Sequence, residues 1–430
     1  MTSSPSDLPQ GSTDEADASS LAPAEVARVQ RRSVWVLSIG QILGGLAFGA
    51  TLSLGAVLAA EISGDEAFSG LAAAAVTLGT AALAVPLASF ARRSGRRISL
   101  ATGMSIALVG VVVVVLAVAI ASFPLLLVAF ALVGAGQAAN LQTRFAAADL
   151  ATDATRGRDL SIVVWATTIG AVLGPNLTGP GEVLGEAVGM PPLTGPYLIT
   201  VVAQLLGIGL YLVALRPDPL LLAQRVVAAA RASTTAIAKP DDPIVARYAI
   251  FAVAAAHGVM VSVMAMTPVH LLHHGASLSI IGLTISLHIA GMYALSPVFG
   301  ILADRVGRIP TILVGQALLV AALLTASFGA ESSVTVTLAL VLLGLGWSAT
   351  TVAGSALLTE ASSERQRTRR QGLSDLIMSL VGATGAILAG LVLAWIGYGG
   401  LALAVGVLVI ATVLLAPFGR RPRVLADPSA

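Results

Sequence analysis

Long apolar segments separated by short polar stretches recur along almost the whole chain, and each can cross a bilayer as a helix of about 20 residues. Polar and apolar residues do not alternate within these segments, which excludes membrane-spanning strands. The pattern therefore predicts twelve transmembrane helices. They are expected at 34–60, 68–91, 98–120, 123–147, 160–179, 196–215, 245–270, 277–303, 310–329, 334–358, 372–395 and 398–417.

Composition agrees with this pattern. Of the 430 residues, 56% are hydrophobic and only 11% are charged, which is too few charges to cover the surface of a soluble protein of this size. The predicted fold class is an all-α membrane protein. The chain has no cysteine, so it forms no disulfide and any metal site must do without thiolate.

The longest polar interruption divides the predicted helices into two sets of six. The expected organisation is a disordered cytoplasmic tail (1–33), a first six-helix half (34–215), a cytoplasmic central loop (216–244), a second six-helix half (245–417) and a cytoplasmic tail (418–430). The central loop contains a stretch that fits either an amphipathic surface helix or a solvated linker. At an offset of 212 residues, glycines and arginines of the first half fall on glycines and arginines of the second, which indicates a repeat.

Basic residues lie only in every second loop, whereas glutamates and aspartates gather in several of the others. Loops rich in Lys and Arg stay in the cytoplasm, so both termini are predicted to be cytoplasmic. Lys239 is the one lysine among 24 basic residues, a bias typical of GC-rich bacterial genomes. We therefore expect a multi-pass protein of a bacterial cytoplasmic (inner) membrane.

Residues 300–308, Gly-Ile-Leu-Ala-Asp-Arg-Val-Gly-Arg, join the eighth and ninth predicted helices. Gly300 permits a close helix contact, and Gly307 belongs to the same candidate gating segment. Asp304 ends a helix, where its negative charge needs a partner: Arg305, Arg308 or a helix N-terminus in the other half. The segment resembles the GxxxDRxGR loop of the major facilitator superfamily, in which this loop latches the two halves together. An ordinary charged cytoplasmic turn is the alternative.

The corresponding segment of the first half is 88–96, Ala-Ser-Phe-Ala-Arg-Arg-Ser-Gly-Arg. Arg92 stands where the acidic residue of the pattern would be. An equivalent latch is therefore not expected on that side, and gating is predicted to be asymmetric.

A second fragment, residues 170–175, contains Gly170, Gly174 and Pro175. Small residues there allow close packing, and the proline bends the helix. The fragment resembles the GxxxGP element of proton-coupled drug antiporters and keeps an export function open.

All histidines of the chain lie in one short region: His257, His270, His273, His274 and His288. Four of the eight methionines lie there too: Met260, Met264, Met266 and Met292. His257, Met260 and Met264 share one face of the seventh helix, and His288 and Met292 share one face of the eighth. Thioether and imidazole groups together suit a soft cation, with Cu(I) the first choice.

The remaining members of this group fall near the outer end of the seventh helix. Met266, His270, His273 and His274 could collect a metal ion there. Two alternatives stay open: methionines of membrane helices often serve only as apolar filler, and His288 could carry a proton.

The motif pair Met260-Val-Ser-Val-Met264 and His288-Ile-Ala-Gly-Met292 resembles the MxxxM and HxxxM pair of the CcoA-like copper importers, which are major facilitator proteins. This resemblance implies Met260, Met264, His288 and Met292 as copper ligands. His257 is added from its position on the same helical face.

Few other polar residues interrupt the predicted helices. Gln142 and Arg144 lie near the cytoplasmic end of the fourth helix, and Asp375 near that end of the eleventh. A structural pair of Arg144 with Asp149 is expected, with an anion- or proton-linked role as the alternative.

The predicted function is secondary active transport by alternating access, most specifically copper import through the Met/His site. The alternative is proton-coupled export of drugs or other small hydrophobic molecules. No enzyme motif is present, so we expect no enzyme. Copper is expected as transported ion and no tightly bound cofactor is expected. The expected partners are the lipid bilayer and a small-molecule or metal-ion substrate, without nucleic acid, and the protein is expected to be a monomer.

Overall fold

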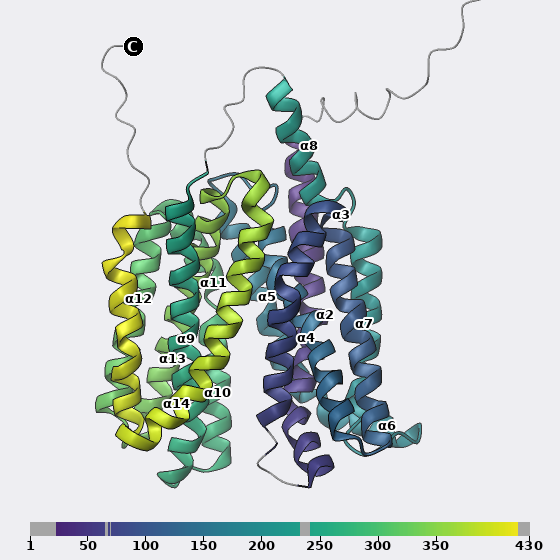
Figure 1. Ribbon diagram of the computed structural model, residues 1–430, viewed down its shortest axis with the longest axis vertical. Helices are drawn as coiled ribbons and strands as arrows, with labels where there is room; N and C mark the ends of the chain where they lie inside the picture. Colours follow the sequence, from purple (N-terminus) through teal and green to yellow (C-terminus); the bar gives the residue numbers. More distant parts are fainter. Residues whose placement is uncertain (1–22, 65–67, 69, 233–240, 420–430) are drawn as a thin grey trace, which may run out of the picture.

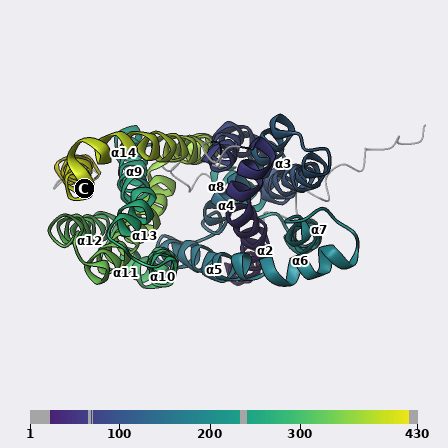
Figure 2. The ribbon, with the colours of Figure 1, turned by 90° about the horizontal axis from the view of Figure 1, so that it is seen from below.

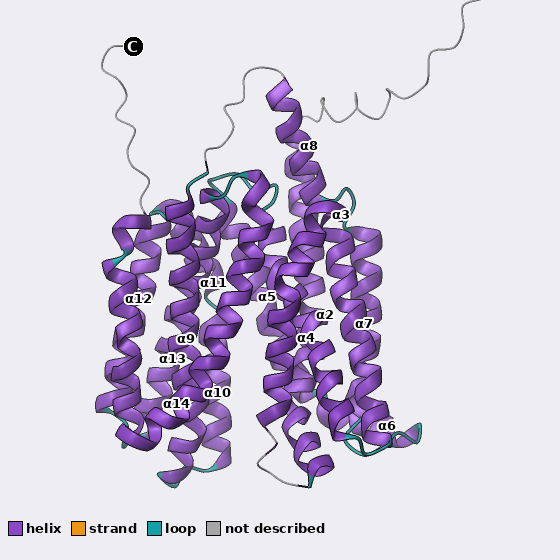
Figure 3. Ribbon diagram, in the orientation of Figure 1, coloured by secondary structure: helices purple, strands orange, loops and turns teal. Residues whose placement is uncertain are grey.

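The structure is a computed structural model, and it describes residues 23–64, 68, 70–232 and 241–419. The described residues form helices and short connections, with no strand among them (Figure 3). The helices of the first half and its linker are α2 (Pro23–Ser63), α3 (Gly70–Ala119), α4 (Phe123–Ala146), α5 (Arg156–Asn176), α6 (Thr178–Ala187), α7 (Gly195–Ala214) and α8 (Pro219–Ala232). Those of the second half are α9 (Pro243–His273), α10 (Leu278–Tyr293), α11 (Ser296–Arg305), α12 (Arg308–Phe328), α13 (Ser333–Ala361) and α14 (Glu364–Leu414), with a 3-10 turn at Ala416–Gly419.

Two of these helices contain two membrane passes each. α3 turns at Gly95 (φ 86°) and α14 turns at Gly397 (φ 71°), where the backbone adopts positive φ values that suit only glycine. Eight described helices are long and apolar enough to span a membrane, and these two carry a second pass. With α2 and α5 alongside them, and α10 and α11 taken as one pass, the described chain forms two six-helix halves.

The two halves lie side by side (Figures 1 and 2). α5 packs against α11 and α10 on one side of the boundary, and α14 packs against α3 on the other. The helices of the two halves converge at the end that carries α8 and diverge toward the other end (Figure 1). We call the converging end, where the arginine-rich turns at Gly95 and Gly307 lie, the basic end.

The outer surface is strongly apolar. Large hydrophobic side chains stay exposed along the spans, among them Phe328, Val334 and Trp395, each at least 80% exposed. A soluble protein rarely exposes so much contiguous apolar surface, whereas a bilayer covers it. The interior is closely packed, and Phe145 of α4 enters a core cluster formed otherwise by the second half, so apolar contact also joins the halves at the basic end.

Two element boundaries differ from those expected, and one alternative left open is decided. α2 begins at Pro23, inside the segment expected to be a disordered tail, because proline starts a helix readily and Glu25 favours its first turn; the rest of that tail lies outside the described residues. In the central loop the structure has the helix alternative: α8 lies there and extends beyond the basic end of the bundle (Figure 1). The eighth predicted helix is broken into α10 and α11, because Pro297 cannot donate a backbone hydrogen bond and starts a new helix.

Candidate functional site

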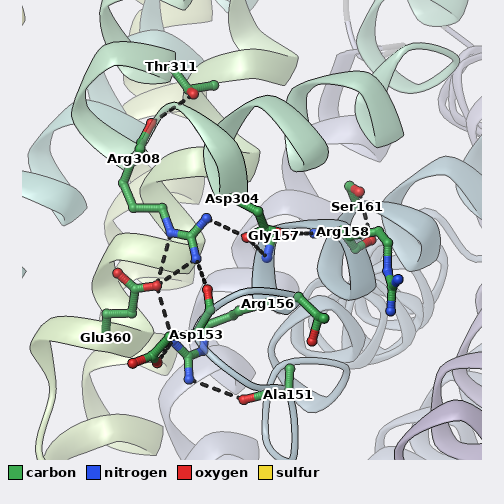
Figure 4. A network of polar contacts seen from close by, with 12 residues as sticks. Ala151, Asp153, Arg156, Gly157, Arg158, Ser161, Asp304, Arg308, Thr311 and Glu360 are labelled. Carbon is green, nitrogen blue, oxygen red and sulfur yellow. Dashed lines mark hydrogen bonds and ion pairs between the residues drawn. The ribbon is translucent and has the colours of Figure 1, made fainter.

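The turn between α11 and α12 joins the two halves through Asp304. Its Oδ1 and Oδ2 accept the backbone N–H groups of Gly157 and Arg158 at the start of α5, each at 2.8 Å (Figure 4). Arg308 donates to the same carboxylate at 2.5 Å. A carboxylate at a helix N-terminus interacts favourably with the free N–H groups and the helix dipole. Asp304 therefore uses two of its proposed partners at once, a helix N-terminus of the other half and Arg308, whereas Arg305 is exposed.

A second carboxylate, Glu360 of α13, extends this contact (Figure 4). Its Oε1 accepts hydrogen bonds from Arg308 at 2.7 Å and from Arg156 of the first half at 3.0 Å. Arg156 also donates to Asp153 at 2.6 Å. Charges of both halves thus form one ion-pair cluster at the basic end.

Glycines allow the two backbones to come close enough for these bonds. A Cβ atom at Gly300 of α11 would collide with Ser161 and with the Gly157 backbone, and one at Gly157 would collide with Gly300 and Asp304. Ser296 donates to the backbone oxygen of Ser161 at 3.1 Å just beside them. The close helix contact predicted for Gly300 is therefore present.

The corresponding turn of the first half has a different environment. Arg92 is exposed. Arg96 is fully buried, where it pairs with Asp149 at 2.8 Å and donates to Gln371 of α14 at 2.7 Å. The backbone N–H of Arg97 donates to Asp218, just before α8, at 2.7 Å.

The expected pair of Arg144 with Asp149 is wrong. Arg144 of α4 instead forms an ion pair with Asp375 of α14, across the boundary between the halves. Asp149 is occupied by Arg96. The reason is geometric, because Arg144 lies on the face of α4 that points to the second half, and sequence proximity to Asp149 does not reveal this.

His288 lies in the interior of the second half. Its side chain is fully buried, and its Nδ1 lies 2.7 Å from the backbone oxygen of Leu340 in α13. A carbonyl oxygen only accepts, so Nδ1 carries the proton and Nε2 keeps its lone pair. Nε2 is buried and has no hydrogen-bond partner among the described residues. Metal-binding histidines typically have this arrangement, with the second nitrogen fixed by a backbone carbonyl.

The predicted methionines gather in one core cluster of the same half. Met260 of α9 and Met292 of α10 are both buried members of it, and Met264 and Met266 pack against it. Gly291 and Gly344 bring α10 and α13 close together at the level of His288 and Met292. The methionines of α9 and α10 that were predicted to share a site therefore lie in or against one core.

His257 has different partners from His288. Its Nδ1 accepts the indole N–H of Trp347 at 3.1 Å, so the proton of the neutral ring lies on Nε2. Its ring also lies against Gly382 of α14. In this arrangement His257 offers no free lone pair to a metal ion.

The residues expected at the outer end of α9 divide into two groups. His270 is buried, bonds the backbone oxygen of Ala330 at 2.7 Å and stacks on Tyr398 at 4.2 Å between ring centroids. His273 and His274 are exposed, and Met266 is partly buried. Only the two exposed histidines are placed to meet solvent.

Gly170 of α5 packs directly on the α2 backbone at Gly45, as expected for a close-packing glycine. Gly174 and Pro175 lie near the end of α5, and their side-chain environment lies outside the described part of the chain.

Comparison with known proteins decides the family. The family model of the Major Facilitator Superfamily matches residues 37–277 and 248–429. The uncharacterized MFS-type transporter YdeG of Bacillus subtilis is 36% identical over 404 residues, covering 92% of this chain and 93% of the relative. The chain is a major facilitator transporter.

Two further similarities are more distant. The riboflavin transporter RfnT of Brucella anthropi is 27% identical, covering 85% of this chain and 89% of the relative. The crystal structure of the human organic anion transporter MFSD10 superposes with a TM-score of 0.74 at 17% identity, over 90% of this transporter and 99% of that chain. The predicted fold and the prediction of a transporter rather than an enzyme are confirmed by the family.

Several contacts of the transporter were not anticipated from sequence. Glu360 and Gln371 were not singled out, although each joins the halves. Asp375 was noted without its partner. A carboxylate inside an otherwise apolar helix is costly unless it is paired, so its position alone indicates that a basic residue of another helix faces it.

Proposed function

We propose that this transporter imports copper by alternating access, with Met260, Met264, His288 and Met292 as ligands of the ion in transit. The observation that carries the proposal is the buried, unpartnered Nε2 of His288, in the same half as the core that contains Met260 and Met292 and against which Met264 packs. A buried lone pair without a hydrogen bond is unfavourable unless something binds it. A soft cation fits a set of thioethers and one neutral imidazole.

The direction and location belong to the same proposal. The arginine-rich loops favour a bacterial cytoplasmic membrane with the basic end in the cytoplasm. Contacts through Asp304, Glu360 and Phe145 hold the halves together at that end. An ion would therefore reach the site from the opposite, external side, where His273 and His274 are exposed.

The test is copper accumulation in cells at matched membrane expression. Met260→Leu, Met264→Leu and Met292→Leu remove sulfur and keep side-chain volume, and His288→Asn removes the Nε2 ligand. We expect each to lower copper uptake by about tenfold or more. Met104→Leu is the matched control, because Met104 is buried in the first half, away from the proposed ligands. Copper uptake at the wild-type rate in all four variants would reduce the methionines to apolar packing.

A second candidate is transport of a small organic solute. The relative RfnT is named a riboflavin transporter, and the glycine contact at Gly170 suits the drug-export alternative. Uptake of riboflavin and resistance to a drug panel, measured in the same strains, separate this candidate from copper import. Riboflavin uptake or drug resistance that depends on expression of the transporter, and that the four ligand substitutions leave unchanged, would favour an organic solute over copper.

A further inference from the structure

Two histidines at the end of α9 lie ring against ring. His270 and His274 are four residues apart, so they share one face of the helix end. Their ring centroids are 4.2 Å apart, and the rings are tilted by 47°. This end of α9 lies opposite the basic end, where the helices of the two halves diverge (Figure 1). The pair is therefore separate from the Met/His core proposed above.

A backbone carbonyl fixes the proton of His270. Its Nε2 lies 2.7 Å from the backbone oxygen of Ala330, in the connection between α12 and α13. A carbonyl oxygen only accepts, so Nε2 carries the proton and Nδ1 keeps its lone pair. The ring also stacks on Tyr398, whose hydroxyl hydrogen-bonds the Thr267 hydroxyl at 2.9 Å. These contacts hold the His270 ring in one orientation.

His274 is fixed in the same way by its own helix. Its Nδ1 lies 2.9 Å from the backbone oxygen of His270, so Nδ1 carries the proton and Nε2 keeps the lone pair. The side chain is exposed, so an ion can reach it from solution. Metal-binding histidines typically have one nitrogen held by a carbonyl in this manner. The two neighbouring imidazoles therefore each offer one lone pair.

The spacing and the local charge both suit a cation. Metal–nitrogen bonds of about 2 Å put the centroids of two imidazoles on one ion roughly 4.5–5 Å apart, close to the distance between these rings. The charged or titratable groups that act on His270 are His273, His274 and Glu331. With the histidines neutral, the Glu331 carboxylate leaves the local charge negative. Among the described residues no third histidine or carboxylate completes a metal-binding group, so water must fill the other coordination positions.

We propose that His270 and His274 bind a divalent transition-metal cation from the external side, through Nδ1 of His270 and Nε2 of His274. Imidazole suits Cu²⁺, Zn²⁺ and Ni²⁺, whereas the methionines of the core suit Cu(I). The bound cation draws electron density from the His270 ring, so its Nε2–H donates more strongly to Ala330. The ion thereby stabilises the contact between α9 and the connection of α12 with α13.

The test is Cu²⁺ binding to the purified full-length transporter in lipid nanodiscs, without a histidine tag. Cu²⁺ is the probe because nitrogen sites bind it most tightly among the divalent first-row ions, and the chain has no cysteine to compete. Electron paramagnetic resonance should show splitting from two nitrogens. His274→Ala should weaken binding by about tenfold or more and leave one nitrogen. His273→Ala is the matched control, since it removes an exposed imidazole next in the chain and should keep the affinity and spectrum of wild type.

A second variant and a second readout guard against loss of the fold. His270→Gln keeps an amide N–H for Ala330 but removes the imidazole, so it should also lose the two-nitrogen signal. Excess Zn²⁺ should raise the thermal unfolding midpoint of wild type and His273→Ala, and leave both pair variants unchanged. The proposal is overturned if wild type lacks the two-nitrogen signal, if both pair variants keep it, or if His273→Ala abolishes it. The proposal does not rest on copper import: His288→Asn should keep this signal, so either proposal can fail alone.

Discussion

The turns at Gly95 and Gly307 have the same backbone and different chemistry. Both glycines combine a positive φ with an extended ψ, 86° and 168° at Gly95 and 110° and 162° at Gly307. They are 212 residues apart, at the offset of the sequence repeat. The second turn presents Asp304 to the N-terminus of α5, whereas the first has the exposed Arg92 at the matching place.

The difference shows that the repeat preserves backbone geometry more strictly than charge. The second turn binds the opposite half directly. The first turn binds mainly its own half and linker, through Asp149 and Asp218, and reaches the other half through one bond from Arg96 to Gln371. The basic end is therefore closed by unequal contacts on its two sides.

The largest effect should come from removing the charge of the second turn. Asp304→Asn removes the carboxylate from the α5 N-terminus and one of the two carboxylates that contact Arg308, so we expect a loss of about 3 kcal/mol in the free energy of unfolding. Chemical denaturation in detergent micelles measures it. Arg92→Ala is the control at the matching position, and it should stay within about 0.5 kcal/mol of wild type. Equal losses at both positions would mean that the two turns are equivalent.

A smaller effect should distinguish the two glycines. Alanine at either position is strained by the positive φ, by about 1–3 kcal/mol. A Cβ atom at Gly95 would also collide with the Asp218 carboxylate, whereas at Gly307 it would meet only Pro310 at 3.5 Å. Gly95→Ala should therefore lower the thermal unfolding midpoint more than Gly307→Ala. Adding Asp218→Ala to Gly95→Ala should bring its unfolding midpoint closer to that of Gly307→Ala. An unchanged difference between the two midpoints would contradict a collision with Asp218.

The smallest effect concerns the pair between Asp241, at the end of the central loop, and Arg370 of α14. Burial alone would raise the pKa of Asp241, but hydrogen bonds from the Ser363 N–H and Arg370 outweigh it and hold this pKa below its ordinary value. A lowered pKa in the folded state stabilises the protein above the unfolded carboxyl pKa of about 3.9, and the stabilisation is lost as pH falls through the lower folded value.

Asp241→Asn should accordingly be slightly less stable than wild type at neutral pH, and the difference should shrink in acid. Thermal unfolding across a pH series measures this. Arg370→Gln should behave like Asp241→Asn, and Arg369→Gln, at an exposed neighbour, should match wild type. A difference that grows in acid would contradict the direction of the pKa change.

Most of the fold could be predicted from the sequence because membrane spans are encoded locally. Apolar length located the passes, and the GxxxDRxGR segment located the turn at Gly307. The break between α10 and α11 was missed because the apolar pattern continues through Pro297. The early start of α2 was missed because its first turns are polar.

The candidate site was predictable only in part. Helical spacing identifies which residues share a face, and this grouped Met260 with Met264 and His288 with Met292. Helical spacing does not show which residue of another helix is the partner of a buried polar atom. Arg144 and Asp375 are 231 residues apart, and only the packing of α4 against α14 brings them together.

The cluster around Glu360 has a consequence for the separation of the halves. Glu360 and Asp304 each contact Arg308 in their own half, and Arg156 contacts Asp153 in its own half. If the halves separate here, every one of these groups still has an oppositely charged neighbour beside it. Opening this cluster therefore leaves no charged group without an opposite charge beside it, which lowers the electrostatic cost of separating the halves here.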